Sequence, residues 1–367
     1  MSVSYGGDSI TFADSSTIAS GFTGFKNRII NGGMVIDQRN AGASVTPNGT
    51  YTLDRWSAVN SQTGKFSVQQ VSDAPDGFLN SLKITSLSAY SVLVGDYFDI
   101  QQHIEGFNIA DLGWGTASAK TVTLSFWTKS SLTGTFGGVI RNNSYNYNYP
   151  FTYTISVANT WEYKTVTITG ATSGTWLTTN GIGASVWFGL GVGATYSGTA
   201  GAWGALAGAS SATGATSVVG TNGATFYITG VQLERGSTAS SFEYRSYGTE
   251  LALCQRYCYV MRSASTLSQV GFSSAQSTTS AFLGIYLPVT PRTNPTGITA
   301  SSGSCLNSYA ANSNVPTTVI AIPSGWTFAG NFVTMQLTTA GSLVAGQVSP
   351  TYFNSATATI EFTGMEL

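Results

Sequence analysis

The sequence predicts an all-β protein: a jelly-roll or β-sandwich domain followed by a second, smaller β-sandwich domain, with one short connecting helix. Apolar and polar residues alternate over many short stretches, which clusters of Gly, Asn, Asp and Ser separate. No long amphipathic helical pattern lies between these stretches. Many short strands of this kind are typical of sandwiches and jelly rolls. At 367 residues the chain is long enough for two such domains.

We expect three parts along the chain. Residues 1–26 are rich in Ser, Thr and Gly and form either a flexible leader or an anchor that orders only against other subunits. The jelly roll is predicted over residues 27–247. The connecting helix and the second β-sandwich are predicted over residues 248–367.

Period-two alternation predicts the strands of the first domain. They are expected near residues 66–68, 82–84, 98–104, 122–127, 161–168, 185–190 and 226–233. In the last of these, the heavy apolar positions change phase at Gly230, as at a β-bulge. The run Glu-Leu-Ala-Leu-Cys-Gln-Arg-Tyr-Cys at 250–258 almost lacks Gly, Ser and Thr and therefore predicts the helix.

The second domain shows the same alternation. Its strands are expected near residues 269–272, 281–288, 317–322, 331–337 and 358–367. The segments 228–233 and 362–367 share the pattern apolar, Thr, Gly, apolar, polar, Leu. We therefore expect each domain to end in a similar strand with a glycine bulge, although a match of six residues can also arise by chance.

Charge and cysteine content exclude several classes of function. Only 8% of the residues are charged and the formal net charge is −1, so the chain has no basic surface for nucleic acid. No apolar run is long enough for a membrane span, and the first residues do not form a secretory signal. Cys254, Cys258 and Cys305 form no C-x-x-C pair, and we expect them to be buried free thiols.

Aromatic residues provide the candidate ligand site. Tyr145, Tyr147 and Tyr149 lie at two-residue spacing, and Trp203 interrupts a long stretch of Gly, Ala, Ser and Thr between residues 193 and 223. On an extended chain the three tyrosines would share one face, where their rings could stack on sugars while the intervening asparagines bind hydroxyls. The alternative is that some of these rings belong to the core. The irregular stretch is expected to be functional or packed against another subunit.

The residues suited to catalysis are sparse. His103 is the single histidine and lies in a predicted strand, where a structural role is expected. Two acid pairs, Asp96 with Asp99 and Glu105 with Asp111, have the residue types of a glycosidase, but their spacing along the chain does not establish the required separation. No calcium-loop or phosphate-loop motif is present. We therefore expect no catalytic residues, no metal and no cofactor.

Several motifs resemble tailed-bacteriophage virion structural proteins, chiefly tail-fibre and adhesin-like ones. They are Asn-Arg-Ile-Ile-Asn-Gly-Gly-Met-Val-Ile-Asp-Gln-Arg-Asn at 27–40, Tyr-Thr-Leu-Asp-Arg-Trp at 51–56, Val-Gln-Leu-Glu-Arg-Gly at 231–236 and Glu-Leu-Ala-Leu-Cys-Gln-Arg-Tyr at 250–257. The segments 102–106 and 121–127 are similar to jelly-roll strands of carbohydrate-binding modules. The resemblance covers residues 25 to 260.

This resemblance implies a non-enzymatic virion protein, most specifically a tail fibre or host-recognition element that binds cell-surface glycan. The alternatives are a capsid decoration or head fibre protein and a glycan-degrading tailspike. The expected partners are further copies of the chain in a homotrimer, other virion proteins at the N-terminal segment, and host glycans. The expected location is the particle surface.

Overall fold

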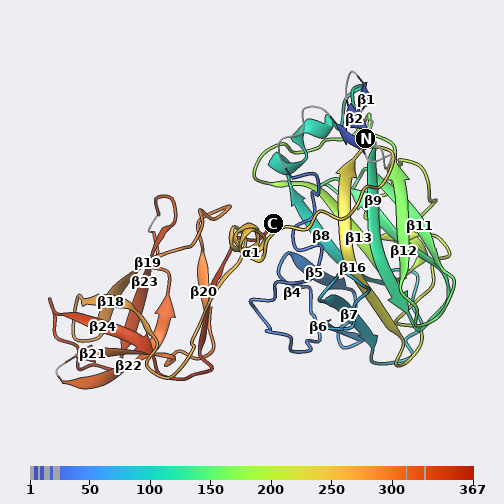
Figure 1. The fold of residues 1–367 in the computed structure, drawn as a ribbon. Helices are drawn as coiled ribbons and strands as arrows, with labels where there is room; N and C mark the ends of the chain where they lie inside the picture. Colours follow the sequence, from blue (N-terminus) through green and yellow to red (C-terminus); the bar gives the residue numbers. More distant parts are fainter. Residues whose placement is uncertain (1–3, 7–8, 12–16, 20–24, 311, 326–327) are drawn as a thin grey trace.

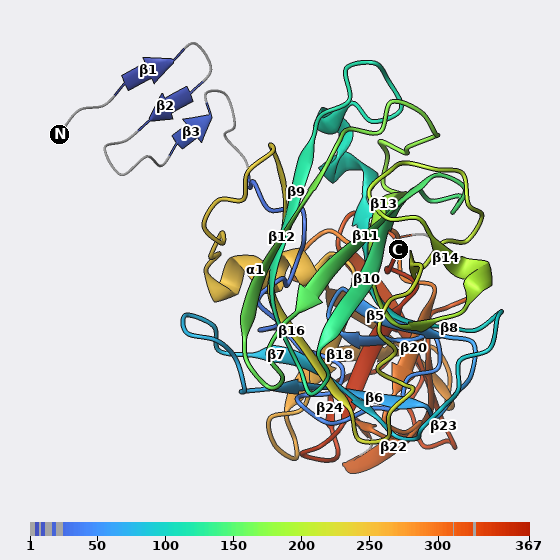
Figure 2. The same cartoon turned by 90° about the vertical axis from the view of Figure 1, so that its right-hand side faces the viewer.

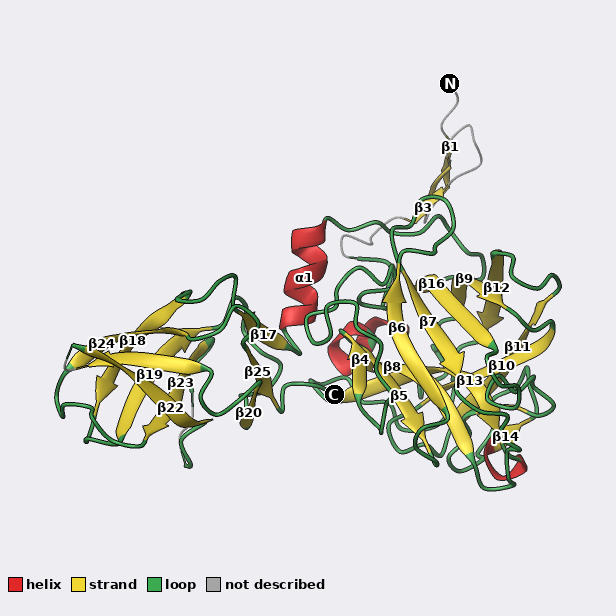
Figure 3. Cartoon of the chain, turned by 90° about the horizontal axis from the view of Figure 1, so that it is seen from below, coloured by secondary structure: helices red, strands yellow, loops and turns green. Residues whose placement is uncertain are grey.

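The computed structural model describes residues 4–6, 9–11, 17–19, 25–310, 312–325 and 328–367. Within these residues, two β-rich bodies flank one α-helix (Figures 1 and 3). The body nearer the N-terminus consists of two facing sheets, and the other contains a barrel and a small sheet. The prediction of an all-β protein with one short connecting helix is confirmed.

Both sheets of the jelly roll are antiparallel. The first has six strands, in the order β11 (Asn148–Ile155), β10 (Gly134–Arg141), β13 (Ile182–Val192), β8 (Tyr97–Glu105), β5 (Trp56–Asn60) and β4 (Tyr51–Leu53). The second has five strands, in the order β12 (Glu162–Ile168), β9 (Val122–Ser130), β16 (Thr225–Arg235), β7 (Ser81–Ser86) and β6 (Phe66–Val71). The connections contain η1 (Gly106–Asn108), η2 (Ala110–Leu112), η3 (Ala194–Tyr196), β14 (Ser197–Gly198) and β15 (Ser211–Ala212).

Alternate residues of the facing strands meet in one apolar core. Phe126 on β9 packs edge to face on Phe188 on β13, with 5.1 Å between ring centroids. The predicted bulge in β16 is confirmed, because its register against β9 shifts between Thr229 and Gln232 and Gly230 has a φ of 60°. The matching Gly364 has a φ of 87°. Both positions therefore need a glycine for the left-handed backbone.

The second body differs in detail from the predicted sandwich. Six strands close into a barrel, in the order β18 (Gln269–Ala275), β19 (Ser280–Tyr286), β23 (Phe332–Thr339), β22 (Ser313–Ala321), β21 (Leu306–Ala310) and β24 (Val348–Phe353). It closes because β24 pairs with both β18 and β21, which leaves the barrel no free edge. A separate sheet of β17 (Tyr259–Arg262), β25 (Thr359–Thr363) and β20 (Gly297–Ala300) lies beside it.

The connecting helix α1 (Tyr247–Gln255) begins and ends three residues earlier than predicted. Ser246 occupies its N-cap, and after Gln255 the chain tightens, because the Tyr257 and Cys258 amides both donate to the Cys254 carbonyl. Cys254 and Tyr257 pack with Ile30 and Ile36 in a small cluster of their own. All three cysteines are buried and free, as predicted.

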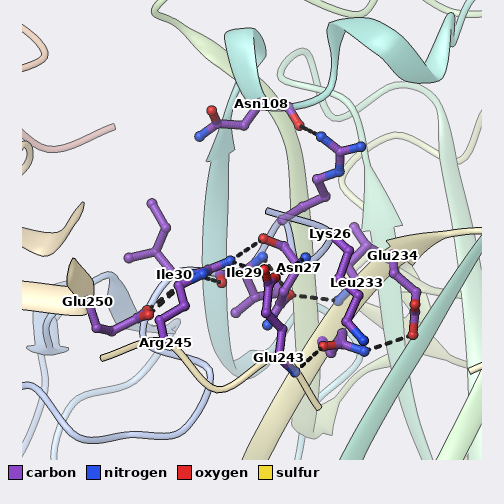
Figure 4. Close-up of polar contacts among 12 residues, drawn as sticks. Lys26, Asn27, Ile29, Ile30, Asn108, Leu233, Glu234, Glu243, Arg245 and Glu250 are labelled. Atoms are coloured by element: carbon purple, nitrogen blue, oxygen red, sulfur yellow. Dashed lines mark hydrogen bonds and ion pairs between the residues drawn. The ribbon is translucent and has the colours of Figure 1, made fainter. Parts of the chain in front are cut away.

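The segment before and after Asn27 is held between β16 and the residues that lead into α1 (Figure 4). The Arg28 amide donates to the Leu233 carbonyl at 2.9 Å, and the Asn27 amide donates to Glu243 at 2.7 Å. Arg245 donates to the Asn27 carbonyl and lies within 3.3 Å of Glu250 at the start of the helix. The motif at residues 27–40 thus connects the jelly roll to the seam, by which we mean the contact between the two bodies around α1.

Ion pairs join the two bodies at the seam. Arg39 contacts Glu361 at 2.8 Å and Glu366 at 3.2 Å. Arg55, which is fully buried, pairs with Glu366 and lies 3.8 Å from the centre of the Tyr257 ring. The last residues of the chain are therefore fixed against the jelly roll.

The first strands are β1 (Ser4–Gly6), β2 (Ser9–Thr11) and β3 (Thr17–Ala19), which pair antiparallel in this order. Figure 2 shows them apart from both larger bodies. The predicted anchor at residues 1–26 otherwise falls largely on residues outside the described part of the chain.

Candidate functional site

The outer face of the six-stranded sheet is the face that points away from the jelly-roll core. Its side chains alternate with core residues on β10, β13 and β8. They include Val139, Arg141, Ser185, Trp187, Asp99, Gln101 and His103. All of them are buried, although this face does not contact the other sheet.

A loop formed by residues 193–212 covers part of this face. A Cβ atom at Gly137 would come within 2.4 Å of the Ser211 Oγ, and one at Gly189 within 2.6 Å. The two strands therefore need glycine where the loop touches them. The guanidinium of Arg141 donates to the carbonyls of Gly208 and Ala209 and so holds the loop on the sheet.

Two rings enclose the Arg141 guanidinium. Its Cζ atom lies 3.5 Å from the centre of the Trp187 ring and 4.0 Å from that of Tyr145. Contacts of this kind between a cation and an aromatic face contribute about 1–2 kcal/mol when they are shielded from water. Arg141 thus connects the sheet, the loop and Tyr145.

Several buried polar atoms on this face lack a hydrogen-bond partner among the described residues. They are both carboxylate oxygens of Asp99, the Gln101 Oε1, the Arg141 Nε, the Trp187 Nε1 and the Ser211 Oγ. The hydroxyl of Ser210 lies beside Asp99 and opposes the rise of its pKa. Buried groups without a partner cost about 1–3 kcal/mol each, so their concentration on one face needs an explanation.

Burial controls the charge of these groups. It raises the pKa of Asp99 well above its ordinary value, while Arg141 and Ser210 oppose this shift. Burial also lowers the pKa of Arg141 to about 10, so its guanidinium stays charged at neutral pH. Burial, together with Arg55 and Arg141, lowers the pKa of His103 to about 3. The imidazole is therefore neutral, and its Nδ1 lies 2.7 Å from the Ser185 hydroxyl.

The structure divides the four predicted ligand residues between two places. Tyr147, Tyr149 and Trp203 belong to an aromatic cluster beside the edge strand β11. Tyr145 has a φ of 56°, precedes β11 and lies instead against Arg141 on the outer face. The three tyrosines therefore do not share the single face that their spacing predicted.

Trp203 lies at the centre of the aromatic cluster. Its ring stacks on Tyr147, with 5.5 Å between centroids and 3° between planes, and meets Tyr149, Trp114 and Trp176 edge to face. Its indole nitrogen donates to the Thr169 carbonyl at 2.7 Å. These contacts favour a packing role for Trp203, which is the alternative that the sequence left open.

We expect Tyr147→Ala to lower the free energy of unfolding by about 2 kcal/mol, because the half-buried ring would leave Trp203 without its stacking partner. Denaturant titration measures this change. Adsorption to host cells, measured in parallel, tests the glycan-binding prediction for the same residue. Unchanged stability with lost adsorption would contradict the packing role.

Most of the acidic residues considered for catalysis form hydrogen bonds or ion pairs with other side chains. Asp96 accepts hydrogen bonds from Ser61 and Tyr90, and Glu105 accepts from Arg256 and Tyr257. Asp111 pairs with Arg28. In the part of the chain that the structure describes, no group of three or more His, Cys, Asp and Glu side chains is placed to hold a metal ion, and no helix has the length and apolarity to cross a membrane.

A separate groove of about 360 Å³ lies on the jelly-roll side of α1, where residues 242–250 meet the segments at 27–35 and 77–80. Phe78, Phe242 and Tyr244 line it and pack on one another, with centroids 5.0–5.5 Å apart. Glu243 and Arg245, which also line it, are engaged with the segment at Asn27. The groove therefore offers apolar ring surface but few free polar groups.

No family model matches the chain, and no curated protein matches it. Among solved structures, the enzymatically active domain of tailspike protein 4 from bacteriophage CBA120 is 15% identical over 57% of this chain and 22% of that chain, with a TM-score of 0.32. This chain thus spans about a fifth of that one.

Carbohydrate-binding modules are also among the similar solved structures. The family 11 module of a Clostridium thermocellum cellulase is 14% identical over 55% of this chain and 99% of that chain, with a TM-score of 0.28. The module TmCBM61, solved with β-1,4-galactotriose, is 12% identical over 58% and 100%, with a TM-score of 0.29. Likenesses at this level carry no functional argument, so the candidate site depends on its own residues.

Proposed function

We propose that this chain is a non-enzymatic glycan-binding protein of a bacteriophage virion, and that the outer face of the six-stranded sheet binds the glycan. One observation carries the binding site: buried polar atoms of Asp99, Gln101, Arg141, Trp187 and Ser211 lie together on this face without hydrogen-bond partners among the described residues. A ligand that satisfied them would recover the free energy that their burial costs.

The chemistry of these atoms fits hydroxyl groups. Arg141 Nε and Trp187 Nε1 only donate, Gln101 Oε1 only accepts, and the Ser211 hydroxyl does both. A sugar hydroxyl also donates and accepts, so neighbouring hydroxyls can satisfy both kinds of group. Burial raises the pKa of Asp99, and the adjacent Arg141 opposes this shift. A sugar, with its many hydroxyl groups, is therefore the ligand class that we propose.

Ligand entry requires the loop at residues 193–212 to lift from the sheet. Arg141 holds it by two carbonyl groups, and Ser211 rests on Gly137 and Gly189. The ring of Trp203 keeps the middle of the loop in the aromatic cluster, so the part that must lift is the part around Ala209. Tyr145, half-buried at the rim, would then stack on the first sugar ring.

The resemblance of the segments at 27–40, 51–56 and 250–257 to phage structural proteins supports placing the protein in a virion as a tail fibre or host-recognition element. The partners that we propose are further copies of the chain in a homotrimer, and other virion proteins at the N-terminal segment. A capsid decoration or head fibre protein is the alternative. A density map of the intact particle would decide between tail and capsid.

We expect Tyr145→Ala to weaken binding of the full-length protein to host polysaccharide by about tenfold, which corresponds to about 1.4 kcal/mol for one lost ring contact. Affinity electrophoresis in gels containing the polysaccharide measures the change. Tyr163→Ala is the matched control, because Tyr163 is exposed on the other sheet. Equal losses in the two variants, or no binding by the wild type, would contradict the proposed site.

A glycan-degrading enzyme is the second candidate, since a buried carboxyl with a raised pKa is suited to act as a general acid. We expect the purified protein to release no reducing ends from the polysaccharide. Release by the wild type that Asp99→Asn abolishes would establish the enzyme instead.

A further inference from the structure

The second body carries very few charges. Residues 263–367 contain three charged side chains, Arg292, Glu361 and Glu366, of the 31 in the chain. All three side chains form polar contacts at the seam. Arg292 donates to the carbonyls of Met365 and Asn180, and the two glutamates pair with Arg39. The barrel surface away from the seam therefore has no charged side chain.

Large apolar side chains are exposed on the same barrel. They are Leu267, Phe272, Tyr286, Tyr309, Val319, Phe332, Val344 and Val348. Two of them lie on paired strands, where Phe272 on β18 faces Pro350 on β24 and Val348 faces Ser274. Phe272 and Val348 are each 62% exposed. Exposed apolar groups without charges around them are typical of surfaces that bind another macromolecule.

We propose that the outer face of β18 and β24, formed by Phe272, Val348 and Pro350, is the surface through which this chain binds further copies of itself. The inference locates the self-association that is part of the proposed function. It commits to one occupant, the barrel surface of a second copy.

The lack of charge on the barrel surface favours a second copy of the chain as the binding partner. Identical charged surfaces repel each other, whereas an uncharged surface meets its own copy without an electrostatic cost. A partner with a charged surface would lose the hydration of its charges and would find no opposite charge on the barrel in return. The barrel is also closed, so copies cannot join by pairing strand edges and must meet through outward side chains. Phe272 and Val348 provide such side chains on neighbouring strands.

The absence of charged residues also determines how self-association depends on salt. Screening by salt weakens ion pairs, while salts such as sulfate strengthen the association of apolar surfaces. We therefore expect self-association to be unchanged by sodium chloride and to be strengthened by sulfate. An interface built on ion pairs would weaken in both salts.

The test compares two double variants of the full-length protein. Phe272→Ser with Val348→Asp changes the barrel face. Phe107→Ser with Val157→Asp is the matched control on the jelly roll, where the exposed fractions are 60% and 56%. Analytical ultracentrifugation over a micromolar range gives the dissociation constant of each. All four positions are exposed, so the variants are expected to fold, and circular dichroism checks this.

We expect the barrel variant to raise the dissociation constant at least tenfold and the control variant to leave it unchanged. A wild type that is monomeric throughout the range would overturn both this inference and the proposed self-association. An oligomeric wild type with equal constants for both variants would overturn the assignment of the surface alone. Neither result depends on glycan binding, which the polysaccharide gels measure separately.

Discussion

We expect Glu366→Ala to lower the free energy of unfolding by about 3 kcal/mol, because it leaves the buried Arg55 without its carboxylate partner. The guanidinium keeps its hydrogen bond to the His103 carbonyl and its contact with Tyr257, so the loss falls at the lower end for a broken buried pair. Arg39 keeps Glu361. Urea unfolding of the full-length protein, followed by tryptophan fluorescence, measures the change.

Glu162→Ala is the control for this experiment. Glu162 also pairs with a cation, Lys164, but both side chains are partly exposed on the strand β12. Pairs at the surface contribute less than about 1 kcal/mol. If Glu366→Ala destabilises the protein no more than Glu162→Ala does, the seam pair does not hold the two bodies together.

Alternation predicted the strands that have large apolar residues at every second position. It located β9 and β16, including the bulge at Gly230, because burial on one or both faces leaves a period of two in the sequence. It missed β10, where Gly137 and Gly138 interrupt the pattern. A Cβ at Gly138 would lie 2.5 Å from the Phe151 ring. Glycine is required there because of residues that are distant in the sequence, so no local sequence pattern identifies β10 as a strand.

Two strands of the second body were also missed, because their sequences carry no local strand signal. The sequences of β21 and β24 are Leu-Asn-Ser-Tyr-Ala and Val-Ser-Pro-Thr-Tyr-Phe. They contain Ser, Asn and Pro, which are also typical of turns, so the sequence did not identify them as strands. Their inward hydroxyls pair with each other instead, as Ser308 and Thr351 do with Ser273. Closure of the barrel depends on these two strands and was therefore not predictable from alternation.

The candidate site was predicted in part. The spacing of the tyrosines drew attention to Tyr145, which lies at the rim of the outer face. Asp99 was noticed only as half of an acid pair. Arg141 and Trp187 are 46 residues apart in the sequence but side by side on β10 and β13. No local pattern predicts that approach, because it depends on the order of strands in the sheet.

The buried carboxyl of Asp54 gives the protein a distinct pH dependence. Burial raises its pKa from 3.8 to about 6, although hydrogen bonds from Gln38 and the nearby Arg39 oppose the shift. Between these two values the folded protein holds a proton that the unfolded chain releases. The contribution of Asp54 to stability is therefore present below pH 4 and is lost as the pH rises to 6. The loss amounts to about 3 kcal/mol.

Replacing Asp54 with Asn removes this titration. We expect Asp54→Asn to gain about 3 kcal/mol relative to the wild type when the pH is raised from 4 to 7, since the amide stays neutral at both values. Urea unfolding at a series of pH values measures the difference between the two proteins, so that shifts of other groups cancel. In the control Asp73→Asn, the stability difference from the wild type changes with pH in the opposite direction and by a smaller amount, because Lys129 lowers the pKa of the half-exposed Asp73. A stability difference between Asp54→Asn and the wild type that does not vary with pH would show that Asp54 titrates normally in the folded protein.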